Sequence, residues 1–340
     1  MALFDTAPKS DPKFLYGRDK ELETLSDHIK NKDWVILLGP RRIGKTSLAE
    51  CTINKLGLKG IILDARKKND FEEALLSSLT QPDKSIHIGA NAKIPNTPIG
   101  VEIDYVKKAP KADLGALLDK TKRLVILVDE VQWFGNPKKV VMLLAHIYDY
   151  YYDKITFIIT GSAVGVTRSI IDPGPTSALY GRALSKIEVA KWAPQVSIDF
   201  IREGCKEKGL SYSERLLLDV EKRLDGIPGW LTLFGYNYTQ SKTANEALKQ
   251  TSKEAFKIIA GELENLNKYG IGSEKQFAVL KVLTKGPQRF KDLSEETGFN
   301  DTTLSNHLDT LERLGYIIKN SKGSYVINDP VLEAYISEKV

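Results

Sequence analysis

A nine-residue stretch, GPRRIGKTS, contains the residue types that a phosphate-binding loop (P-loop) needs. It lies between an apolar run that predicts a buried strand and a stretch that predicts a helix. Glycines let backbone N–H groups wrap phosphates, a lysine places a cation on the β and γ phosphates, and a threonine hydroxyl binds Mg²⁺. We therefore expect nucleotide contacts from Gly39, Pro40, Arg41, Arg42, Ile43, Gly44, Lys45, Thr46 and Ser47. Lys45 is also a predicted catalytic residue, and Thr46 a predicted metal ligand.

A second apolar run, LVILVDEVQ, ends in two adjacent carboxylates. Asp129 closes the predicted strand, where a carboxylate can bind the nucleotide and hold the water shell of Mg²⁺ as a metal ligand. Glu130, one residue further on, can orient or deprotonate an attacking water and is the predicted catalytic base. Acidic residues are common at strand ends, so a capping or surface role is the alternative for Glu130.

Two further segments offer groups that could meet the terminal phosphate. The run Ile155 to Ile159 ends on Thr160-Gly161-Ser162, and either hydroxyl could contact the γ phosphate or the attacking water. Ser162 is preferred to Thr160, and an ordinary turn at the end of the strand is the alternative for both. Arg182 precedes the last predicted strand, and we expect it near the carboxyl edge of the sheet. An always-charged, planar guanidinium suits a phosphoryl transition state, while a surface ion pair is the alternative.

The elements that must position these residues form an α/β domain. Continuous apolar runs separated by helical stretches are typical of parallel strands covered on both faces. The segment Ser85 to Val106 alternates weakly and is interpreted as an inserted hairpin. The predicted strands are 34–38, 61–63, 124–128, 155–159 and a weaker one at 187–189.

The rest of the chain has no such strands. From Pro194 the pattern is helical, and from Gly272 three short helices followed by two short strands predict a winged helix-turn-helix. The expected organisation is a nucleotide-binding α/β domain over 1–192, a helical lid over 193–270 and the winged helix over 271–340.

Composition excludes several classes of protein. The chain has 340 residues and two cysteines, too few for a disulfide framework or a four-ligand structural zinc site. No apolar run approaches the roughly 20 residues that span a bilayer, and the start of the sequence has no apolar signal core. We expect a soluble, cytoplasmic protein with no membrane contact.

Charge gives weak support for DNA binding. The net charge is +5, and the segment 274–327 has eight basic and seven acidic residues, a balance of +1. Phosphate contacts supply most non-specific affinity for DNA, and this segment has few cations to make them. DNA binding is therefore not favoured, although a helix over 302–314 would bring Thr303, Ser305, Asn306 and His307 near base edges, with Lys319 and Lys322 as phosphate contacts.

The ordered set of motifs resembles the archaeal ATPase family of P-loop proteins, near the STAND branch of the AAA+ class. The motifs are LYGRDKELETL, GPRRIGKTS, LVDEVQ, TGSAVG, LYGRALSKIEV and DGIPGWLTLFG, followed by the winged helix. The resemblance implies sheet order 5-1-4-3-2 and an α-helical lid, with adenine between Tyr16-Gly17 and the lid near Pro228. It also implies that Arg182 meets the γ phosphate, from this subunit or a neighbour. Family members commonly have Phe in place of Tyr16 and often a second glycine in place of Asp225, which affects the fit around the adenine.

These observations predict an AAA+/STAND-like ATPase that hydrolyses ATP with Mg²⁺, releases ADP and repositions its lid and winged helix with nucleotide state. ATP rather than GTP rests on the family resemblance. Two alternatives remain open: a slow or non-hydrolysing switch for protein association, and a DNA-binding regulator controlled by nucleotide. Apart from ATP, the expected partners are a second copy of the chain or an unidentified protein.

Overall fold

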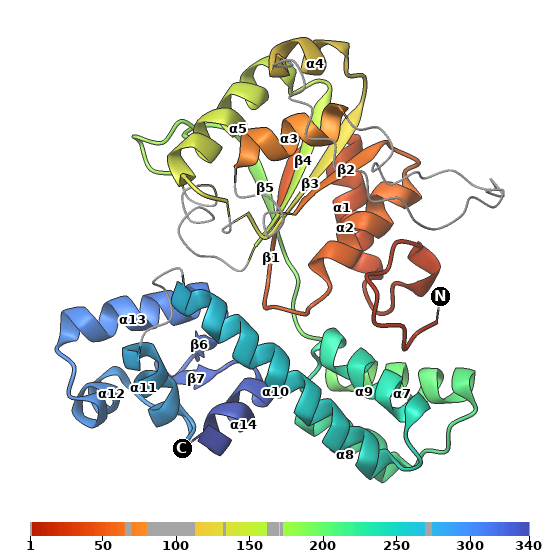
Figure 1. The fold of residues 1–340 in the computed structure, drawn as a ribbon, viewed down its shortest axis with the longest axis vertical. Coiled ribbons are helices and arrows are strands. Elements are labelled where there is room, and N and C mark those ends of the chain that lie inside the picture. Colours follow the sequence, from red (N-terminus) through yellow and green to blue (C-terminus); the bar gives the residue numbers. More distant parts are fainter. Residues whose placement is uncertain are drawn as a thin grey trace, which may run out of the picture.

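The computed structural model describes residues 2–64, 70–80, 113–131, 134–161, 170, 173–268 and 274–339. Figure 1 shows a sheet domain, a group of lid helices and a winged helix, with one long helix that joins the lid helices to the winged helix. The hairpin expected between Ser85 and Val106 lies outside the described residues.

Five parallel strands form the central sheet, in the order β2-β3-β4-β1-β5. This is the expected order 5-1-4-3-2, which is confirmed. The carboxyl ends of β1, β3 and β4 therefore lie side by side at one edge. The strands are β1 (Trp34–Leu38), β2 (Gly60–Asp64), β3 (Leu124–Asp129), β4 (Ile155–Gly161) and β5 (Leu184–Glu188).

Helices cover both faces of the sheet. Along β1, Trp34 and Ile36 pack into a core shared with α3, α4 and α5, while Val35 and Leu37 pack into a second core shared with α1 and α2. Because alternate side chains are buried on opposite faces, the strand is a continuous apolar run in the sequence. The helices are α1 (Asp19–Lys30), α2 (Lys45–Lys55), α3 (Phe71–Thr80), α4 (Leu114–Lys120) and α5 (Pro137–Tyr151); a short 3-10 turn, η1 (Pro12–Phe14), precedes α1.

The lid consists of helices that follow β5. A proline stands at the first position of α7 and of α9, where the missing N–H costs no hydrogen bond. Gly209, in a left-handed conformation, ends α7. The helices are α7 (Pro194–Lys208), α8 (Glu214–Leu224), α9 (Pro228–Gln240) and α10 (Ala244–Lys268), of which α10 extends from the lid to the winged helix. None of the helices that the structure describes is long and apolar enough to cross a membrane.

The C-terminal part is a winged helix-turn-helix, as expected. Strands β6 and β7 pair antiparallel, with Ile317 opposite Ile327. The final helix, α14, packs on α10 and α11 and was not predicted. The elements are α11 (Glu274–Leu283), α12 (Phe290–Thr297), α13 (Asp301–Arg313), β6 (Ile317–Lys319), β7 (Tyr325–Ile327) and α14 (Pro330–Lys339).

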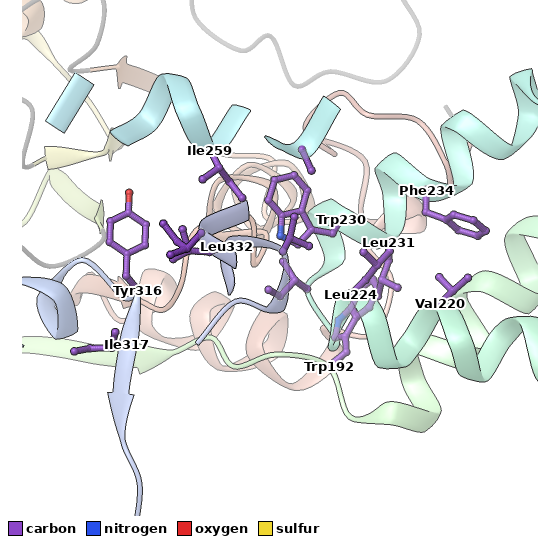
Figure 2. Packing of buried hydrophobic residues seen from close by; sticks show 14 of the residues in the cluster. Trp192, Val220, Leu224, Trp230, Leu231, Phe234, Ile259, Tyr316, Ile317 and Leu332 are labelled. Atoms are coloured by element: carbon purple, nitrogen blue, oxygen red, sulfur yellow. The ribbon is translucent and has the colours of Figure 1, made fainter. Parts of the chain in front are cut away.

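The lid and the winged helix share one hydrophobic core. Figure 2 shows Trp230 of α9 and Ile259 of α10 in the same buried cluster as Tyr316 and Leu332 of the winged helix. Burial of apolar area is non-directional and cumulative, so a shared core couples the two parts energetically. The boundaries at 192 and 270 remain predictions, but the packing indicates that the lid and winged helix are not independent of each other.

Candidate nucleotide-binding site

The P-loop connects the carboxyl end of β1 to the first turn of α2. Gly39 and Gly44 have φ angles of +151° and +95°, which L-residues rarely adopt. A Cβ atom on Gly39 would lie 2.3 Å from the carbonyl oxygen of Val189, so only glycine fits there. The sequence pattern therefore reflects real steric requirements of this loop.

The ammonium group of Lys45 lies inside the loop. Its Nζ donates to the carbonyl oxygens of Gly39, at 2.7 Å, and of Pro40, at 2.8 Å. Burial lowers the pKa of Lys45, and the carboxylates of Glu130 and Asp129 oppose that shift. Because burial disfavours the charged form of Lys45, an anionic ligand beside the ammonium group is favourable. A lysine that binds phosphate in a P-loop needs this property.

The predicted metal ligands are adjacent. The Thr46 hydroxyl donates to Oδ1 of Asp129 at 3.0 Å, and the Thr160 hydroxyl donates to the same oxygen at 2.6 Å. Asp129 is 6% exposed. A carboxylate and a threonine hydroxyl at this distance, beside the P-loop, are oxygen donors of the kind that Mg²⁺ prefers, and these residues fit that ion.

Of the two hydroxyl candidates at the carboxyl end of β4, Thr160 is part of this cluster. Besides contacting Asp129, its Oγ1 accepts a hydrogen bond from the backbone N–H of Glu130 at 3.2 Å. The preferred candidate, Ser162, lies outside the described residues.

Glu130 lines the same cavity as Lys45 and Thr46. Its φ of +55° is unusual for a residue with a side chain. Strained backbone of this kind occurs at functional sites when the surrounding structure holds it in place. A second acidic residue, Glu50, lies on α2 one turn after Thr46, and burial together with the charge of Asp129 raises its pKa to about 7.

A cavity of about 390 Å³ opens from the P-loop towards the lid. Its far wall is aromatic, with Tyr16, Trp192 and Phe200 in edge-to-face or tilted contact at 5.0–5.8 Å between ring centroids. Pro228, at the start of α9, also lines it. An apolar, partly aromatic wall next to a phosphate-binding loop is suited to the base of a nucleotide.

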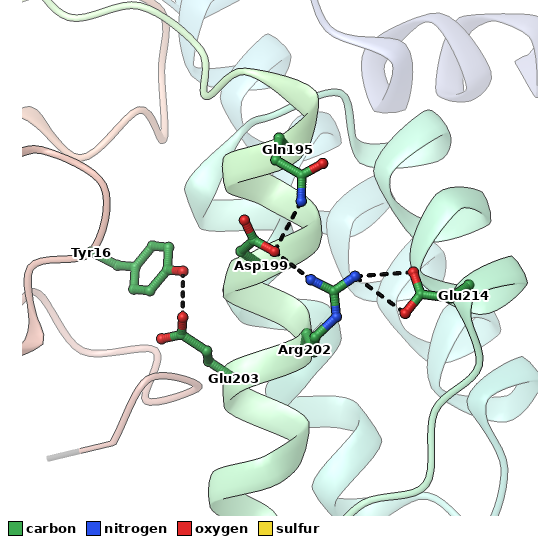
Figure 3. A network of polar contacts seen from close by, with 6 residues as sticks. All are labelled: Tyr16, Gln195, Asp199, Arg202, Glu203 and Glu214. Atoms are coloured by element: carbon green, nitrogen blue, oxygen red, sulfur yellow. Dashed lines mark hydrogen bonds and ion pairs between the residues drawn. The ribbon is translucent and has the colours of Figure 1, made fainter.

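Tyr16 also connects this wall to the lid. Figure 3 shows its hydroxyl donating to Oε1 of Glu203 on α7, at 3.1 Å, beside an ion-pair network in which Arg202 joins Asp199 to Glu214. This hydroxyl, which a phenylalanine at position 16 would lack, therefore bonds to the lid. Gly17 has a φ of +59°, and a Cβ atom there would lie 2.7 Å from Val196 of α7.

Arg18 joins three elements behind the P-loop. The guanidinium group donates to the carbonyl oxygens of Ile43, at 3.1 Å, and of Ala190, at 2.7 Å, and it pairs with Glu21 at 2.9 Å. It is 4% exposed. Arg18 is part of the LYGRDKE motif, but no feature of the sequence predicted this role for it.

The two arginines of the loop contact the lid helices α9 and α10. Arg41 pairs with Glu262 at 3.0 Å, and Arg42 pairs with the same carboxylate. Arg42 also lies over the ring of Trp230, with Cζ 4.1 Å from the centroid, and its carbonyl oxygen accepts a hydrogen bond from the N–H of Gly229 at 3.0 Å. Arg41 and Arg42, which lie between the two glycines of the P-loop, therefore connect this loop to α9 and α10.

The winged helix reaches the same loop. A small cavity is lined by Pro40 and Arg41 of the P-loop, by Glu262 and by Gly315 and Tyr316 of the winged helix. The Trp230 indole N–H donates to Oδ2 of Asp329 at 2.9 Å, which links the lid to the start of α14. These contacts depend on chain folding over long sequence separations, and no local pattern in the sequence indicates them.

The expected position of Arg182 is wrong. β5 runs parallel to β1, and its first residue, Leu184, pairs with Trp34 at the start of β1. A residue before a parallel strand lies at the amino edge, so Arg182 is at the opposite edge from the P-loop, which follows Leu38. There its Nε donates to Asp149 of α5 at 2.9 Å. In this arrangement Arg182 does not reach the P-loop of its own chain.

The fold and this site define an AAA+-like P-loop NTPase carrying a winged helix. Residues 15–234 match the family described as an ATPase domain predominantly from Archaea, and the chain belongs to that family. Residues 273–319 match a helix-turn-helix family described as bacterial regulatory proteins of the arsR family.

Solved structures resemble the whole chain. A Walker-type ATPase of Pyrococcus abyssi matches with a TM-score of 0.81 and 25% identity, over 98% of this chain and 99% of that one. The ORC2 protein of Aeropyrum pernix, solved in ADPNP-ADP complexes, matches with a TM-score of 0.64 and 17% identity, over 99% and 98%. Cdc6p of Pyrobaculum aerophilum matches with a TM-score of 0.51 and 16% identity, over 99% of this chain and 96% of that one. The last two show similarity of fold alone. No curated protein matches the chain.

Proposed function

We propose that the protein is an ATPase of the AAA+/STAND type that binds ATP with Mg²⁺ and couples its nucleotide state to the positions of the lid and winged helix. The observation that carries this proposal is that Glu262 of α10 forms ion pairs with both arginines of the P-loop, Arg41 and Arg42. A change at the phosphates thereby acts directly on the helix that joins the lid to the winged helix.

The proposed hydrolytic roles follow from the site. Lys45 contacts the β and γ phosphates, and Thr46 and Asp129 hold Mg²⁺, which neutralises charge developing on the phosphates. Glu130 orients the attacking water and accepts its proton. Thr160 positions Asp129 and the Glu130 backbone through two hydrogen bonds. The aromatic wall formed by Tyr16, Trp192 and Phe200 takes the adenine.

The proposed coupling uses charge. Two arginines share one carboxylate, and all three side chains are 14–22% exposed, so their pairing is stronger than that of a fully solvated pair. A triphosphate bound in the loop competes with Glu262 for the same guanidinium groups. We therefore expect α10, and the winged helix packed on it, to loosen from the P-loop when ATP binds.

The test is phosphate release from Mg·ATP at increasing protein concentration, with Glu130→Gln as the blank. Activity above the blank supports an ATPase, and specific activity that increases with concentration indicates that a second copy completes the site. Nucleotide binding with activity equal to the blank at all concentrations would instead favour the alternative, a non-hydrolysing switch for protein association.

The match of residues 273–319 to arsR-type regulators favours DNA binding as a second candidate. Several cations of this domain are already engaged, since Lys285 pairs with Glu296 and Lys291 with Glu295, and Lys319 lies over the ring of Tyr325. A mobility-shift assay at low salt, with Lys322→Ala as the comparison, tests it: tight binding that requires Lys322 would establish the DNA-binding function.

A further inference from the structure

The N-terminal segment Ala2–Lys9, the strap, lies along the cavity beside the P-loop. Leu3 and all five residues from Asp5 to Lys9 line that cavity together with the P-loop. In Figure 1 the N-terminal segment lies beside α2, between the sheet domain and the lid helices. The strap thus forms one wall of the cavity, and no sequence motif predicted that it would.

One end of the strap is attached to the P-loop helix. The backbone N–H of Lys9 donates to Oγ of Ser47 at 3.0 Å, and the Cys51 thiol donates to the Lys9 carbonyl oxygen at 3.3 Å. Ser47 is the last residue of the GPRRIGKTS motif. The strap therefore contacts the phosphate-binding turn itself.

The other end is attached to the lid by the ring of Phe4 and by a hydrogen bond from the Leu3 backbone N–H to Oε2 of Glu207 on α7, at 3.1 Å. Phe4 is 2% exposed and contacts Phe200 edge-to-face at 5.6 Å. Two glycines within helices, Gly204 of α7 and Gly235 of α9, form its socket, and a Cβ atom on either would lie 2.2 Å or 2.1 Å from a ring atom of Phe4. Glycine is unfavourable inside a helix, so two of them facing one ring indicate a specific requirement for this contact.

The strap is closed upon itself by Lys9. The ammonium group donates to the carbonyl oxygens of Ala2, at 2.8 Å, and of Asp5, at 2.7 Å. These bonds tie the Phe4 end to the Ser47 end and close the strap into one compact loop.

We propose that the strap retains bound nucleotide, and that exchange requires Phe4 to leave its socket between Gly204 and Gly235. The proposal rests on the proposed function, because it assumes that the cavity holds a nucleotide. Since the strap bridges α2 and the lid, its release separates the walls of the cavity on the side away from the sheet. The nucleotide then dissociates through that opening.

The test measures the dissociation rate of a fluorescent ADP analogue from the full chain. Phe4→Ala should raise that rate about tenfold or more, and Gly235→Ala, which fills the socket, should do the same. In the double variant the two effects should not add, because both remove one contact. Leu217→Ala, a fully buried position of α8 that does not line the cavity, is the control for general loss of lid stability and should leave the rate unchanged.

Two results overturn the proposal in distinguishable ways. Suppose first that the wild-type chain binds the analogue. If Phe4→Ala then releases it at the wild-type rate, or no faster than the control Leu217→Ala does, the strap has no role in retention. If the wild-type chain binds no analogue at all, the proposed function fails, and retention fails with it.

Discussion

The guanidinium group of Arg42, in the P-loop, lies 4.1 Å from the centre of the Trp230 ring, at the start of lid helix α9. The same indole donates to Asp329 at the start of α14. One side chain of the lid thus contacts the phosphate-binding loop on one side and the winged helix on the other. Because a cation over an indole is attracted to the ring face and Glu262 adds a charge partner, this junction depends on the electrostatics of the loop.

Glu262→Gln should weaken the contact between α10 and the P-loop and make nucleotide binding tighter. The variant removes the carboxylate that pairs with Arg41 and Arg42, which leaves two partly buried cations without their anion. A bound triphosphate supplies that charge, so we expect affinity for Mg·ATP to increase about tenfold. Equilibrium titration with a fluorescent ATP analogue measures it.

Glu264→Gln is the matched control for this experiment. Glu264 is an exposed residue of the same helix, two positions further along, and the substitution is chemically identical. Equal affinities for the two variants would contradict the proposed coupling through Glu262.

Lys45→Ala should weaken nucleotide binding by about a hundredfold or more, because a buried charge-assisted contact to phosphate is lost. Its ammonium group is the buried cation of the P-loop, bonded to the carbonyl oxygens of Gly39 and Pro40. Lys55→Ala, at the exposed end of the same helix, should leave affinity unchanged. Unaltered binding by Lys45→Ala would remove the basis for assigning the phosphate site to this loop.

Arg182 gives a test of assembly. At the amino edge of the sheet it can serve an active site only in a neighbouring subunit, so Arg182→Ala should reduce turnover by up to about 10³ while nucleotide affinity changes little. Asp149→Asn breaks the same ion pair but keeps the arginine. If phosphate release falls equally in both variants, the residue stabilises the fold and does not contribute to hydrolysis.

Much of the sheet domain could be predicted because its strands are buried on both faces. Continuous apolar runs indicated β1, β3 and β4, and the glycine pattern placed the P-loop. β5, at the edge of the sheet, has the mixed sequence LSKIE and was placed only partly, at 187–189 rather than Leu184–Glu188. The strand direction was predicted correctly, and Arg182 was misplaced because a residue that precedes a parallel strand lies at the amino edge of the sheet, not at the carboxyl edge.

The remaining site residues come from long-range packing and have no local pattern. Glu262 is one of many charged residues on an amphipathic helix, and only the orientation of α10 against the P-loop distinguishes it. Phe4 is a single aromatic residue in a polar start, and its partners are helical glycines some 200 residues away. Glu50 acquires its importance from proximity to Asp129, a contact between a helix and a strand distant in sequence.

Glu50 predicts a pH dependence of stability in the protein without nucleotide or Mg²⁺. Burial and the charge of Asp129 raise its pKa from 4.5 to about 7, so ionisation costs the folded state more than the unfolded chain. Stability from this group is therefore fully present below about pH 4.5 and is lost progressively as pH rises through 7. Glu50→Gln removes that loss, and its advantage over wild type should increase from pH 5 to pH 8 to about 1 kcal/mol after allowance for solvent screening.

Thermal unfolding at pH 5 and pH 8 measures this effect as a difference between the two melting temperatures, expected at about 2 °C at pH 8 and near zero at pH 5. Glu23→Gln, an exposed position on α1, serves as the control and should show no such pH-dependent difference. Mg·ATP should alter the result for Glu50 specifically, because a cation at Asp129 offsets the repulsion between the two carboxylates. An advantage of Glu50→Gln that is the same at pH 5 and pH 8 would show that Glu50 does not titrate in this range.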